Sequence, residues 1–579
     1  MKSLWRFGLG LPGRRRVGYR EHSTDTLCRY VGPYRSHYLD QVQHAQPGSK
    51  ITICGIVSSI RPLGHITFII LSDHSGNQVQ VAWRRPPPDS SSSGVDLICR
   101  RLKLHSFCSI TGEVDSNEFR MSSIDVLSTP IAKRWPLRDD TNEDVALRWR
   151  FLQLRRPELQ QRLRLRSRAG HVLRCFLHDR DFVEVETPTL VASSPEGARE
   201  FLVPTRRQGH FFALAQSPQQ FKQLLMMGGF ERYFQFARCF RDEDGRSDRQ
   251  SEFTQVDLEM AFISRREIMS LTEDMIRDLS RRLPELDLRF PERVPVLTYE
   301  CVMSMFGTDK PDLRIPYMEI QHLSDGWKGI ICLNADNHLN HFGNEQVLIV
   351  SNTSTNIPDG LSIPLLSAGD VMILSRNLLK LGQLRNLAAA SLVNAKCLEL
   401  FPTRWLWVTD FPMFEADSRG ALQAVHHPFT APIDSDAFIA AANSNDEQSL
   451  LALRAQSYDL VVNGIEIGGG SIRIHREDIQ KMVFSTISSK ESDFSPLLEG
   501  LHHGAPPHGG IALGFDRLLS EFPLPANSLR DAIAFPKSSH GKDLLMKSPA
   551  TLHNSEQQLN PLGLCLQGHS GLKSCNIVA

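Results

Sequence analysis

The chain has 579 residues, of which 41% are hydrophobic and 22% charged, and its 65 basic side chains are balanced by 65 acidic ones. This length predicts three or four domains, each large enough to bury a core. The balanced charge gives no global sign of a polyanionic partner, so a nucleic-acid surface would have to come from local clusters. Membrane spans are not expected, because no apolar run approaches about 18 residues. The 11 scattered cysteines include no Cys-x-x-Cys pair, which argues against a zinc ribbon or a disulfide framework and predicts reduced thiols.

The N-terminus is basic and has no acidic residue before Glu21. Arg6, Gly8 and Pro12 interrupt the apolar stretch that a secretory signal would need. We therefore predict a mitochondrial transit peptide over residues 1–24 and a location in the mitochondrial matrix; the alternative is a basic tail on a cytosolic protein. The basic side chains are Lys2, Arg6, Arg14, Arg15, Arg16 and Arg20.

Residues 45–131 show several short strand patterns separated by turns. The polar stretch 86–93 predicts an exposed loop. Short strands in such a segment favour a closed barrel of the oligonucleotide-binding (OB-fold) type, although an SH3-like barrel fits the pattern nearly as well. The apolar patterns predict strands over 51–57, 66–71, 79–81 and 107–114.

A connector over residues 132–156 follows, and eight arginines lie between Arg148 and Arg168 with Glu158 as the single acid. Pro157 and Glu158 suit the first turn of a helix. The charge run fits either a solvated helix face or a surface that contacts RNA phosphates. The rest of the chain reads as a larger α+β domain in two parts, an inserted α+β module between them, and a tail without periodicity; these segments are 157–311, 399–545, 312–398 and 546–579.

Two charged segments carry the chemistry. Residues 236–257 read as a hairpin with Arg241 after the rising strand and acids in the loop, which can clamp a nucleotide but equally fits ordinary surface ion pairs. Residues 509–518 read as a glycine-rich strand leading into a helix that bears Arg517, where the backbone can approach a ligand and the guanidinium can meet a phosphate. Each signal is weak alone, and no P-loop motif is present.

In this order, the two segments resemble motifs two and three of the class II aminoacyl-tRNA synthetases, and residues 181–190 resemble motif one, which helps form the dimer in that class. Four further segments narrow the resemblance to the bacterial-type aspartyl-tRNA synthetases, the type also found in mitochondria; they lie at 194–200, 216–223, 426–432 and 463–475. The resemblance implies an OB-fold barrel that reads the anticodon, a class II catalytic domain with a mostly antiparallel sheet, a homodimer, and the substrates L-aspartate, ATP and tRNA(Asp).

The resemblance also implies an aspartate site. An acid and an amide would hold the ammonium group, two cations would hold the side-chain carboxylate, and a histidine would close over the amino acid. Such cations reject asparagine, whose neutral amide would leave them unpaired. The implied residues are Glu196, Gln219 and Asp257 for the ammonium, Lys222 and Arg473 for the side-chain carboxylate, His426 for closure, and Arg241 for the reacting carboxylate.

For the nucleotide, the resemblance implies that Arg241 and Arg517 are the catalytic cations, on the α- and γ-phosphates respectively. Asp459 and Glu466 would bind Mg²⁺ beside the triphosphate. No protein nucleophile is needed, because positioning and charge neutralisation carry the chemistry. The other implied nucleotide-binding residues are Asp242, Glu243, Gln250, Glu466, Gly514, Phe515 and Asp516.

In the barrel, Arg61, Phe68 and Gln80 would bind anticodon bases by stacking and hydrogen bonding, although Phe68 could equally belong to the core. The chain departs from the bacterial pattern at Gln153 and Ile56, where aspartate and tryptophan are usual, and its insertion is shorter. Three alternatives remain: a relative that charges asparagine or lysine, an enzyme that charges both tRNA(Asp) and tRNA(Asn), and a non-catalytic paralogue. The intact catalytic positions argue against the last.

Overall fold

The computed structural model describes residues 32–85, 94–115, 118–132, 135–138, 140–193, 198–243, 249–335, 338–339, 347–351, 361–522, 528–550 and 562. The predicted transit peptide (1–24), the predicted loop at 86–93 and Glu196 lie outside these ranges. The chain forms two compact units, residues 1–136 and 137–579, so the division falls inside the predicted connector. No helix in the described ranges has both the length and the apolarity needed to cross a membrane.

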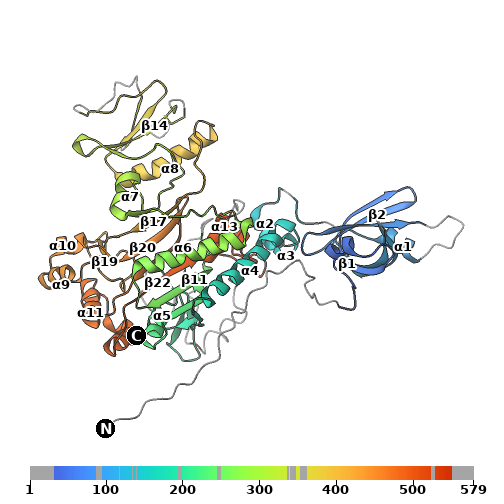
Figure 1. Cartoon of the computed structure of the whole chain (residues 1–579), viewed down its shortest axis with the longest axis horizontal. Helices are drawn as coiled ribbons and strands as arrows, with labels where there is room; N and C mark the ends of the chain where they lie inside the picture. Colours follow the sequence, from blue (N-terminus) through green and yellow to red (C-terminus); the bar gives the residue numbers. More distant parts are fainter. Residues whose placement is uncertain are drawn as a thin grey trace, which may run out of the picture. The chain divides into compact units, whose positions relative to one another are not determined.

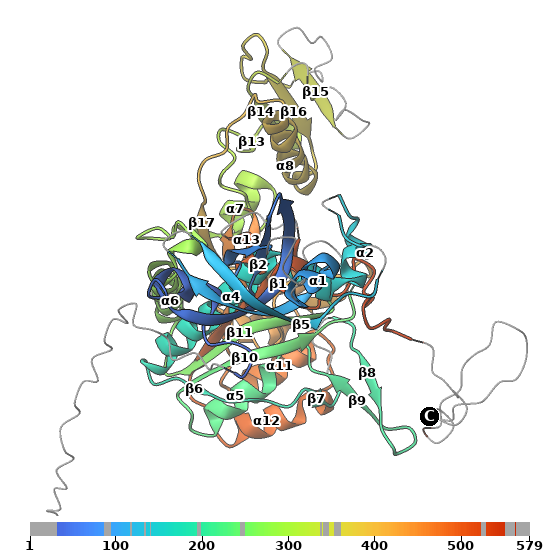
Figure 2. The same ribbon diagram turned by 90° about the vertical axis from the view of Figure 1, so that its right-hand side faces the viewer.

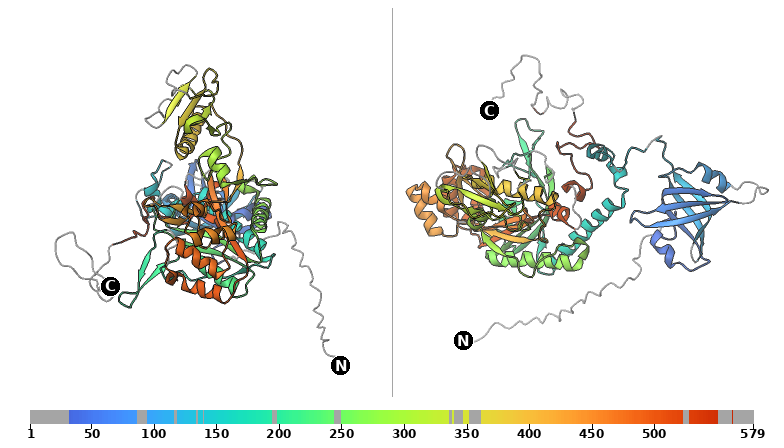
Figure 3. Two further views of the ribbon diagram at one scale, coloured as in Figure 1. Left: turned by 90° about the vertical axis from the view of Figure 1, so that its left-hand side faces the viewer. Right: turned by 90° about the horizontal axis from the view of Figure 1, so that it is seen from above.

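The first unit contains a closed five-stranded barrel (Figures 1 and 3). Its strands pair in the order β1-β2-β3-β5-β4, β4 closes the ring on β1, and α1 (Gly94–Arg101) lies between β3 and β4 in the chain. Ile53, Ile69, Val81 and Ile110 belong to its core and are fully buried. The strands are β1 (Lys50–Leu63), β2 (Ile66–Ser72), β3 (Gln78–Arg84), β4 (Phe107–Val114) and β5 (Phe119–Ser128).

The four strand predictions for this unit are confirmed, with two differences. β1 continues to Leu63, because a register shift between Val57 and Ser59 carries the strand past the point where the apolar alternation ends. The strand patterns do not indicate β5, whose alternation is broken at a second register shift opposite Thr111 and Gly112. This strand nevertheless completes the ring by pairing with both β3 and β4.

The second unit is built on an eight-stranded sheet (Figure 1). Its neighbouring strands are antiparallel except at the two edges, where β12 and β6 pair in parallel, so the predicted mostly antiparallel sheet is confirmed. In spatial order the strands are β12 (Val296–Thr298), β17 (Trp405–Thr409), β20 (Ser457–Val462), β21 (Ile465–Ile472), β22 (His508–Gly514), β11 (Glu252–Ala261), β10 (Arg232–Phe240) and β6 (Val183–Glu184).

Two long helices, α4 (Pro157–His178) and α6 (Arg265–Arg282), lie side by side against this sheet (Figure 1). α4 begins at its proline, as predicted, and buries Phe176 in the core that both helices share with the strands. α6 begins after Ser264, which forms a capping box with Glu267 and satisfies free backbone N–H groups of the first turn.

Shorter elements complete the second unit. The helices are α5 (Gln219–Met227), α7 (Tyr299–Phe306), α9 (Ser435–Ser444), α10 (Glu447–Ala452), α11 (Glu477–Thr486), α12 (Ser495–His502) and α13 (Phe515–Glu521). Two small sheets pair in the orders β7-β9-β8 and β18-β19. Their strands are β7 (Leu190–Val191), β8 (Leu202–Pro204), β9 (Phe211–Leu214), β18 (Phe414–Ala416) and β19 (Leu422–Ala424).

The arginine-rich connector is used largely inside the second unit. Arg150 is buried and donates hydrogen bonds to backbone carbonyls within residues 530–534. Arg162, Arg166 and Arg168 each pair with an acidic side chain of the same unit. Arg150, Arg162 and Arg166 therefore help to hold the fold together, whereas Arg168 and its partner Glu285 are about half exposed. The two alternatives for the charge run, a solvated helix face and a contact with RNA phosphates, stay predictions. The two helices of this segment are α2 (Glu143–Arg148) and α3 (Arg150–Gln153).

The predicted inserted module is a small α+β unit with its own core (Figure 2). Four antiparallel strands pair in the order β13-β14-β16-β15, and α8 packs on the sheet. Ile330, Ile373 and Leu381 are fully buried between the sheet and the helix. The elements are β13 (Gln321–His322), β14 (Lys328–Cys332), β15 (Leu348–Ser351), β16 (Val371–Ser375) and α8 (Leu378–Asn394).

The helices α7 and α8 cross at a pair of glycines. Gly307 ends α7 with a φ of +64°, and a Cβ at this position would lie 2.4 Å from the carbonyl oxygen of Leu378. A Cβ on Gly382 would lie 2.3 Å from the carbonyl oxygen of Gly307. Only residues without a side chain allow this approach. The inserted module is therefore joined closely to the segment that follows α7, residues 308–310.

Candidate active site

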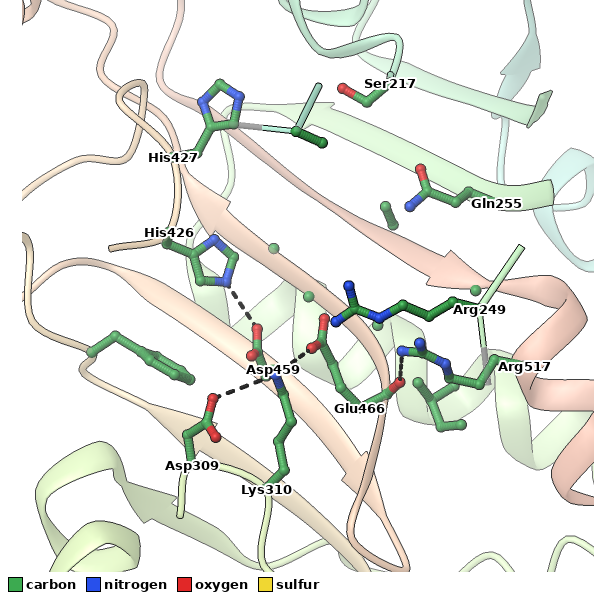
Figure 4. Close-up of a pocket in the computed structure, with 18 of the residues that line it drawn as sticks. Ser217, Arg249, Gln255, Asp309, Lys310, His426, His427, Asp459, Glu466 and Arg517 are labelled. Carbon is green, nitrogen blue, oxygen red and sulfur yellow. Dashed lines mark hydrogen bonds and ion pairs between the residues drawn. The ribbon is translucent and has the colours of Figure 1, made fainter. Parts of the chain in front are cut away.

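A cavity of about 940 Å³ lies in the second unit, bounded by β11, β20, β21 and β22 and by α5, α7, α8 and α13 (Figure 4). Most of the residues predicted for the aspartate and nucleotide sites line it, although they come from distant parts of the sequence. They are Gln219, Lys222, Arg241, Glu243, Gln250, Asp257, His426, Asp459, Glu466, Arg473, Gly514, Asp516 and Arg517.

One group of charges in this site, the buried cluster, consists of Lys222, Asp257, Glu259 and Arg473. Lys222 Nζ lies 2.8 Å from Asp257 Oδ1 and 3.2 Å from Glu259 Oε2. Arg473 donates from Nε to Glu259 Oε1 at 3.1 Å and from Nη1 to Ser471 Oγ at 2.6 Å. The four charged side chains are at most 5% exposed. Two cations are thus fixed around one carboxylate, that of Glu259.

Glu259 can be buried because the residue opposite it has no side chain. β11 pairs with β22 so that Glu259 faces Gly510. A Cβ on Gly510 would lie 2.0 Å from Glu259 Oε2 and 2.1 Å from the carbonyl oxygen of Leu258. The glycine-rich strand therefore makes room for a protein carboxylate, in addition to any ligand that approaches its backbone.

The protonation of the buried cluster follows from burial and pairing. Burial raises the pKa of Asp257, and the nearby Lys222 offsets this effect only in part. Burial acts on Glu259 in the same direction, but the charges of Arg473 and Lys222 outweigh it and hold the pKa of Glu259 below its ordinary value. Pairing with the two cations therefore favours the ionised form of Glu259.

A second group of charges, the open cluster, consists of Lys310, His426, Asp459 and Glu466 (Figure 4). His426 Nε2 lies 2.9 Å from Asp459 Oδ1, and Lys310 Nζ lies 2.9 Å from Glu466 Oε2. The side chains of Lys310 and Glu466 are 37% and 32% exposed. Each acid in this group therefore has a basic side chain as partner, and the Lys310 pair is accessible to solvent.

The pKa values in the open cluster reflect these pairs. Burial alone would lower the pKa of His426, but the charge and hydrogen bond of Asp459 leave it above the ordinary value. Burial likewise opposes the ammonium of Lys310, and Glu466 outweighs it so that the pKa of Lys310 is raised. The adjacent His427 lines the same cavity without an acidic partner in the described ranges; burial and the charge of Arg473 hold its pKa well below the ordinary value.

Asp459 and Glu466 face one small space beside Gly469. A Cβ on Gly469 would lie 2.5 Å from Asp459 Oδ1 and 3.5 Å from Glu466 Oε1. Among the described residues, no group of three or more His, Cys, Asp or Glu side chains gathers as a metal site. Two carboxylates are nevertheless sufficient for Mg²⁺, which keeps several waters and takes further ligands from substrate phosphates. The pair therefore fits a magnesium ion that binds together with a nucleotide.

The two arginines predicted to be catalytic both line the cavity. Arg241 directly follows β10, and its Cζ lies 5.3 Å from the ring centroid of Phe253. Arg517 lies in the first turn of α13, and its Nη1 donates to the backbone oxygen of Glu466 at 2.9 Å. The hairpin and the strand-to-helix turn that were singled out in the sequence thus bring their cations to one cavity.

The other predicted hairpin residues are placed differently from one another. Glu243 lines the cavity and pairs with Arg249. Gln250 also lines it, but its amide exchanges hydrogen bonds with the backbone of residue 537, at 2.8 Å and 3.1 Å. Asp242 pairs with Arg199 at 2.6 Å and is not one of the residues that line the cavity. Gln250 therefore fixes the hairpin against a later segment of the chain.

Two residues after the glycine-rich strand have structural contacts that the prediction did not include. The side chain of Phe515 is buried in the core against Phe236, so a contact with the nucleotide, which stays a prediction, would have to come from its backbone. Asp516 lines the cavity but pairs with Arg166 and accepts a hydrogen bond from the backbone N–H of Thr254 at 2.7 Å. The helical period accounts for the two directions, because successive positions of α13 point about 100° apart around the helix axis.

The three predicted anticodon-binding residues lie on the outer face of β1, β2 and β3 in the barrel. Arg61 pairs directly with Phe68 across the two strands. The neighbours of Phe68, Thr67 and Ile69, are buried, whereas Phe68 is half-buried and Gln80 is exposed. Alternation along a strand therefore points Phe68 away from the core, which excludes the core alternative for this side chain.

The sequence interpretation missed two residues of the site, Glu259 and Lys310. Glu259 had a usable signal, because Gln255, Asp257 and Glu259 alternate along one strand and must share a face. Lys310 had none, because it follows the left-handed Gly307 in a segment without periodicity.

Comparisons with known proteins agree with this geometry. Residues 142–539 match the model of the tRNA synthetases class II (D, K and N). The chain therefore belongs to the class II tRNA synthetases and, within them, to the aspartate–tRNA ligase family. One relative is the aspartate–tRNA ligase of Streptococcus pyogenes serotype M5, with 36% identity over 92% of this chain and 100% of the relative. Another is the mitochondrial aspartate–tRNA ligase of Dictyostelium discoideum, with 35% identity over 90% of this chain and 88% of the relative.

Solved structures share the fold at low sequence identity. The asparaginyl-tRNA synthetase of Pyrococcus horikoshii complexed with asparaginyl-adenylate gives a TM-score of 0.59 at 16% identity, covering 89% of this chain and 99% of that one. The aspartyl-tRNA synthetase of Entamoeba histolytica gives a TM-score of 0.54 at 18% identity, covering 86% of this chain and 90% of that one. At these identities the likeness establishes the class II fold alone.

Proposed function

We propose that the chain activates L-aspartate with ATP and transfers it to tRNA(Asp), as an aspartate–tRNA ligase. The observation that carries this proposal is the buried cluster, in which Lys222 and Arg473 are fixed at a cavity that also holds Arg241 and Arg517. A site with buried cations favours an amino acid with a second carboxylate and rejects one without it. The relatives from Streptococcus pyogenes and Dictyostelium discoideum, both aspartate–tRNA ligases, support the same substrate.

The donors left in the buried cluster suit the aspartate side chain. Arg473 has five N–H bonds, and three of them point to Glu259 and Ser471, which leaves two. Lys222 has three, and two are directed at Asp257 and Glu259, which leaves one. These three donors would bind the side-chain carboxylate. Asparagine would turn its amide donors toward them and leave these three buried N–H groups without an acceptor.

The other groups of the cavity would bind the rest of the substrate. Asp257, Gln219 and Glu196 would hold the ammonium group, and His426 would close over the amino acid. The α-carboxylate attacks the α-phosphorus of ATP, the bond from that phosphorus to the bridging oxygen breaks, and pyrophosphate leaves. Arg241 would neutralise the carboxylate and the α-phosphate during this step, and Arg517 would hold the γ-phosphate.

The second step needs no protein nucleophile. The terminal adenosine hydroxyl of the tRNA attacks the carbonyl carbon of aspartyl-adenylate, and AMP leaves with the electrons of the broken acyl–phosphate bond. Glu243, Gln250 and Gly514 would shape the nucleotide site, with Asp242 and Asp516 holding its supports. Asp459 and Glu466 would hold Mg²⁺, which supplies charge neutralisation to the triphosphate when bound.

We also propose that the barrel is an OB-fold that binds the anticodon. Its strand order β1-β2-β3-β5-β4, with a helix between β3 and β4, supports that fold over an SH3-like barrel. The outward Phe68 would stack on a base, and Arg61 and Gln80 would bind base edges or phosphates.

The working form would be a homodimer in the mitochondrial matrix. Apolar side chains around the motif-one segment, Val183, Leu190, Phe211 and Phe212, are exposed in the single chain, as is typical of a surface that a second copy covers. The basic N-terminal sequence and the mitochondrial relative from Dictyostelium discoideum support the location.

The proposal is tested by ATP–pyrophosphate exchange on residues 25–579 with aspartate, asparagine, glutamate and lysine offered separately. Exchange with aspartate alone is expected, with loss in Arg473→Ala and retention in Arg454→Ala, which removes an arginine with a long, weak contact to Glu300 (3.9 Å). Exchange driven by another amino acid, or none with any of the four in folded protein, would contradict it. Charging of purified tRNA(Asp) and tRNA(Asn) then separates a discriminating enzyme from a relaxed one.

A further inference from the structure

Lys310 lies in the cavity without belonging to any of the motifs that define the site. It comes from the segment between α7 and the inserted module, and its Nζ lies 2.9 Å from Glu466 Oε2 and 3.4 Å from Asp309 Oδ2 (Figure 4). Glu466 is one of the two acids that fit a magnesium ion. A lysine ammonium therefore lies against a carboxylate that a divalent cation would need.

The second carboxylate oxygen of Glu466 is not the one that pairs with Lys310, and it faces Asp459. Glu466 Oε1 faces the space beside Gly469 that it shares with Asp459 Oδ1. Asp459 Oδ1 lies 2.9 Å from His426 Nε2, so both acids already have a side-chain partner in the protein. A divalent ion placed between these acids would lie within a few ångströms of the Lys310 ammonium, and like charges at that distance repel strongly in a partly buried site.

The backbone of Lys310 is anchored, whereas its side chain is free to change partner. Gly307 and Gly382 fix the end of α7 against α8 three residues before Lys310. The side chain itself is 37% exposed and points into a cavity of about 940 Å³. A long flexible lysine can therefore leave Glu466 and reach another anion in the cavity without a change of the fold.

We infer that Lys310 is a positioning residue that neutralises Glu466 in the nucleotide-free protein and makes divalent-cation binding conditional on the nucleotide. When the triphosphate enters, its anionic oxygens give the ammonium a new partner, and Glu466 becomes free for the metal. This role rests on the proposed nucleotide site. It assigns to the segment before the inserted module a function in ordering substrate binding.

The test is a titration of nucleotide-free full-length protein with Mn²⁺ alone, in which free Mn²⁺ is measured by electron paramagnetic resonance. Wild-type protein is expected to bind Mn²⁺ weakly. Lys310→Met removes the competing charge and should tighten binding by more than about tenfold. Lys310→Arg retains a cation and should stay within about threefold of wild type. Lys481→Met, which breaks a similar lysine–glutamate pair (2.7 Å to Glu477) outside the cavity, should change nothing.

Further variants tie the effect to Glu466. Adding Glu466→Gln to Lys310→Met should abolish the gain, and Lys310→Gln repeats the measurement if the methionine variant does not fold. Equal Mn²⁺ affinity in wild type and in the folded neutral variants, or a gain that survives Glu466→Gln, would overturn the inference. The Mn²⁺ titration does not depend on aminoacylation, so it tests Lys310 independently of the proposed function. If the proposed function were wrong, aspartate-dependent ATP–pyrophosphate exchange would be missing while Lys310→Met still tightened Mn²⁺ binding.

Discussion

The two charged clusters of the cavity differ in how far water reaches them. In the buried cluster, Lys222 and Arg473 share the counter-ion Glu259, and every charge is at most 5% exposed. In the open cluster, Lys310 and Glu466 are about one-third exposed, and Lys310 also lies 3.4 Å from Asp309 Oδ2. Removing one partner from the buried cluster costs much free energy, because water cannot solvate the charge that is left unpaired. In the open cluster, solvent weakens the Lys310–Glu466 ion pair, so Lys310 can exchange Glu466 for another anion at little cost. The site thus combines a fixed pocket with a set of charges that can change partner.

Removal of the shared counter-ion should give the largest effect. Glu259→Gln leaves two buried cations with one acid, so we expect the free energy of unfolding to fall by about 3–5 kcal/mol. Glu252→Gln is the matched control, since it lies on the same strand and pairs with Arg238 while one-third exposed; its loss should stay below about 1 kcal/mol. Urea unfolding followed by tryptophan fluorescence measures both. Similar losses in the two variants would remove the distinction between buried and exposed charges.

The space opposite the counter-ion should be nearly as sensitive. Gly510→Ala would place a Cβ 2.0 Å from Glu259 Oε2, so the carboxylate or the strand must move, at a cost of about 1–3 kcal/mol. In Gly514→Ala, on the same strand, the nearest atom would be 3.4 Å away, and unfolding should change little. The same urea experiment compares the two, and a tolerated Gly510→Ala would show that Glu259 is not held by this packing.

The open cluster should respond to pH through His426. Its pKa is raised by Asp459, so the ion pair contributes stability that is fully present below the unfolded value of about 6.5 and is lost as the pH rises through the folded value. His427 behaves oppositely, because its lowered pKa makes stability fall as the pH falls below about 6.5. Histidine NMR titration should place the two rings on either side of that value. Asp459→Asn should lower the pKa of His426. An unchanged pKa in this variant would show that Asp459 does not cause the shift.

An exposed pair at the cavity rim should matter least. Arg249 pairs with Glu243 while 46% exposed. Arg249→Ala should therefore change the free energy of unfolding by less than about 1 kcal/mol, and high salt should reduce even this difference. Urea unfolding at low and high salt checks it. If Arg249→Ala lowered the free energy of unfolding as much as Glu259→Gln, exposure would not explain the difference between exposed and buried ion pairs.

Local patterns in the sequence predicted much of the architecture. The four barrel strands, the start of α4 at Pro157 and the mostly antiparallel sheet follow from alternation, helix-start chemistry and family resemblance. The family resemblance predicts which positions belong to the site, but it does not predict where each side chain points. The resemblance therefore did not predict that the side chain of Phe515 is buried in the core, whereas the strand period settles the outward direction of Phe68.

The residues missed by the sequence interpretation owe their roles to contacts between distant segments. Glu259 acts through Arg473 and Gly510, which pair with it only after the sheet forms. Lys310 reaches Glu466 only because α7 ends where α8 crosses it. The strand alternation could have placed Glu259 on the face of Asp257, but the partners of Glu259 and Lys310 lie too far away in the sequence to be found from a local pattern.

The glycine crossing of α7 and α8 also limits how the inserted module can evolve. Residues can be lost or gained at β15, an edge strand of its sheet, without altering the cavity, since none of the described residues of β15 lines the cavity wall. The first turns of α8 have no such freedom, because Gly307 and Gly382 lie too close for any side chain. Shortening of the insertion should therefore proceed from β15, while Gly307 and Gly382 remain closed to substitution.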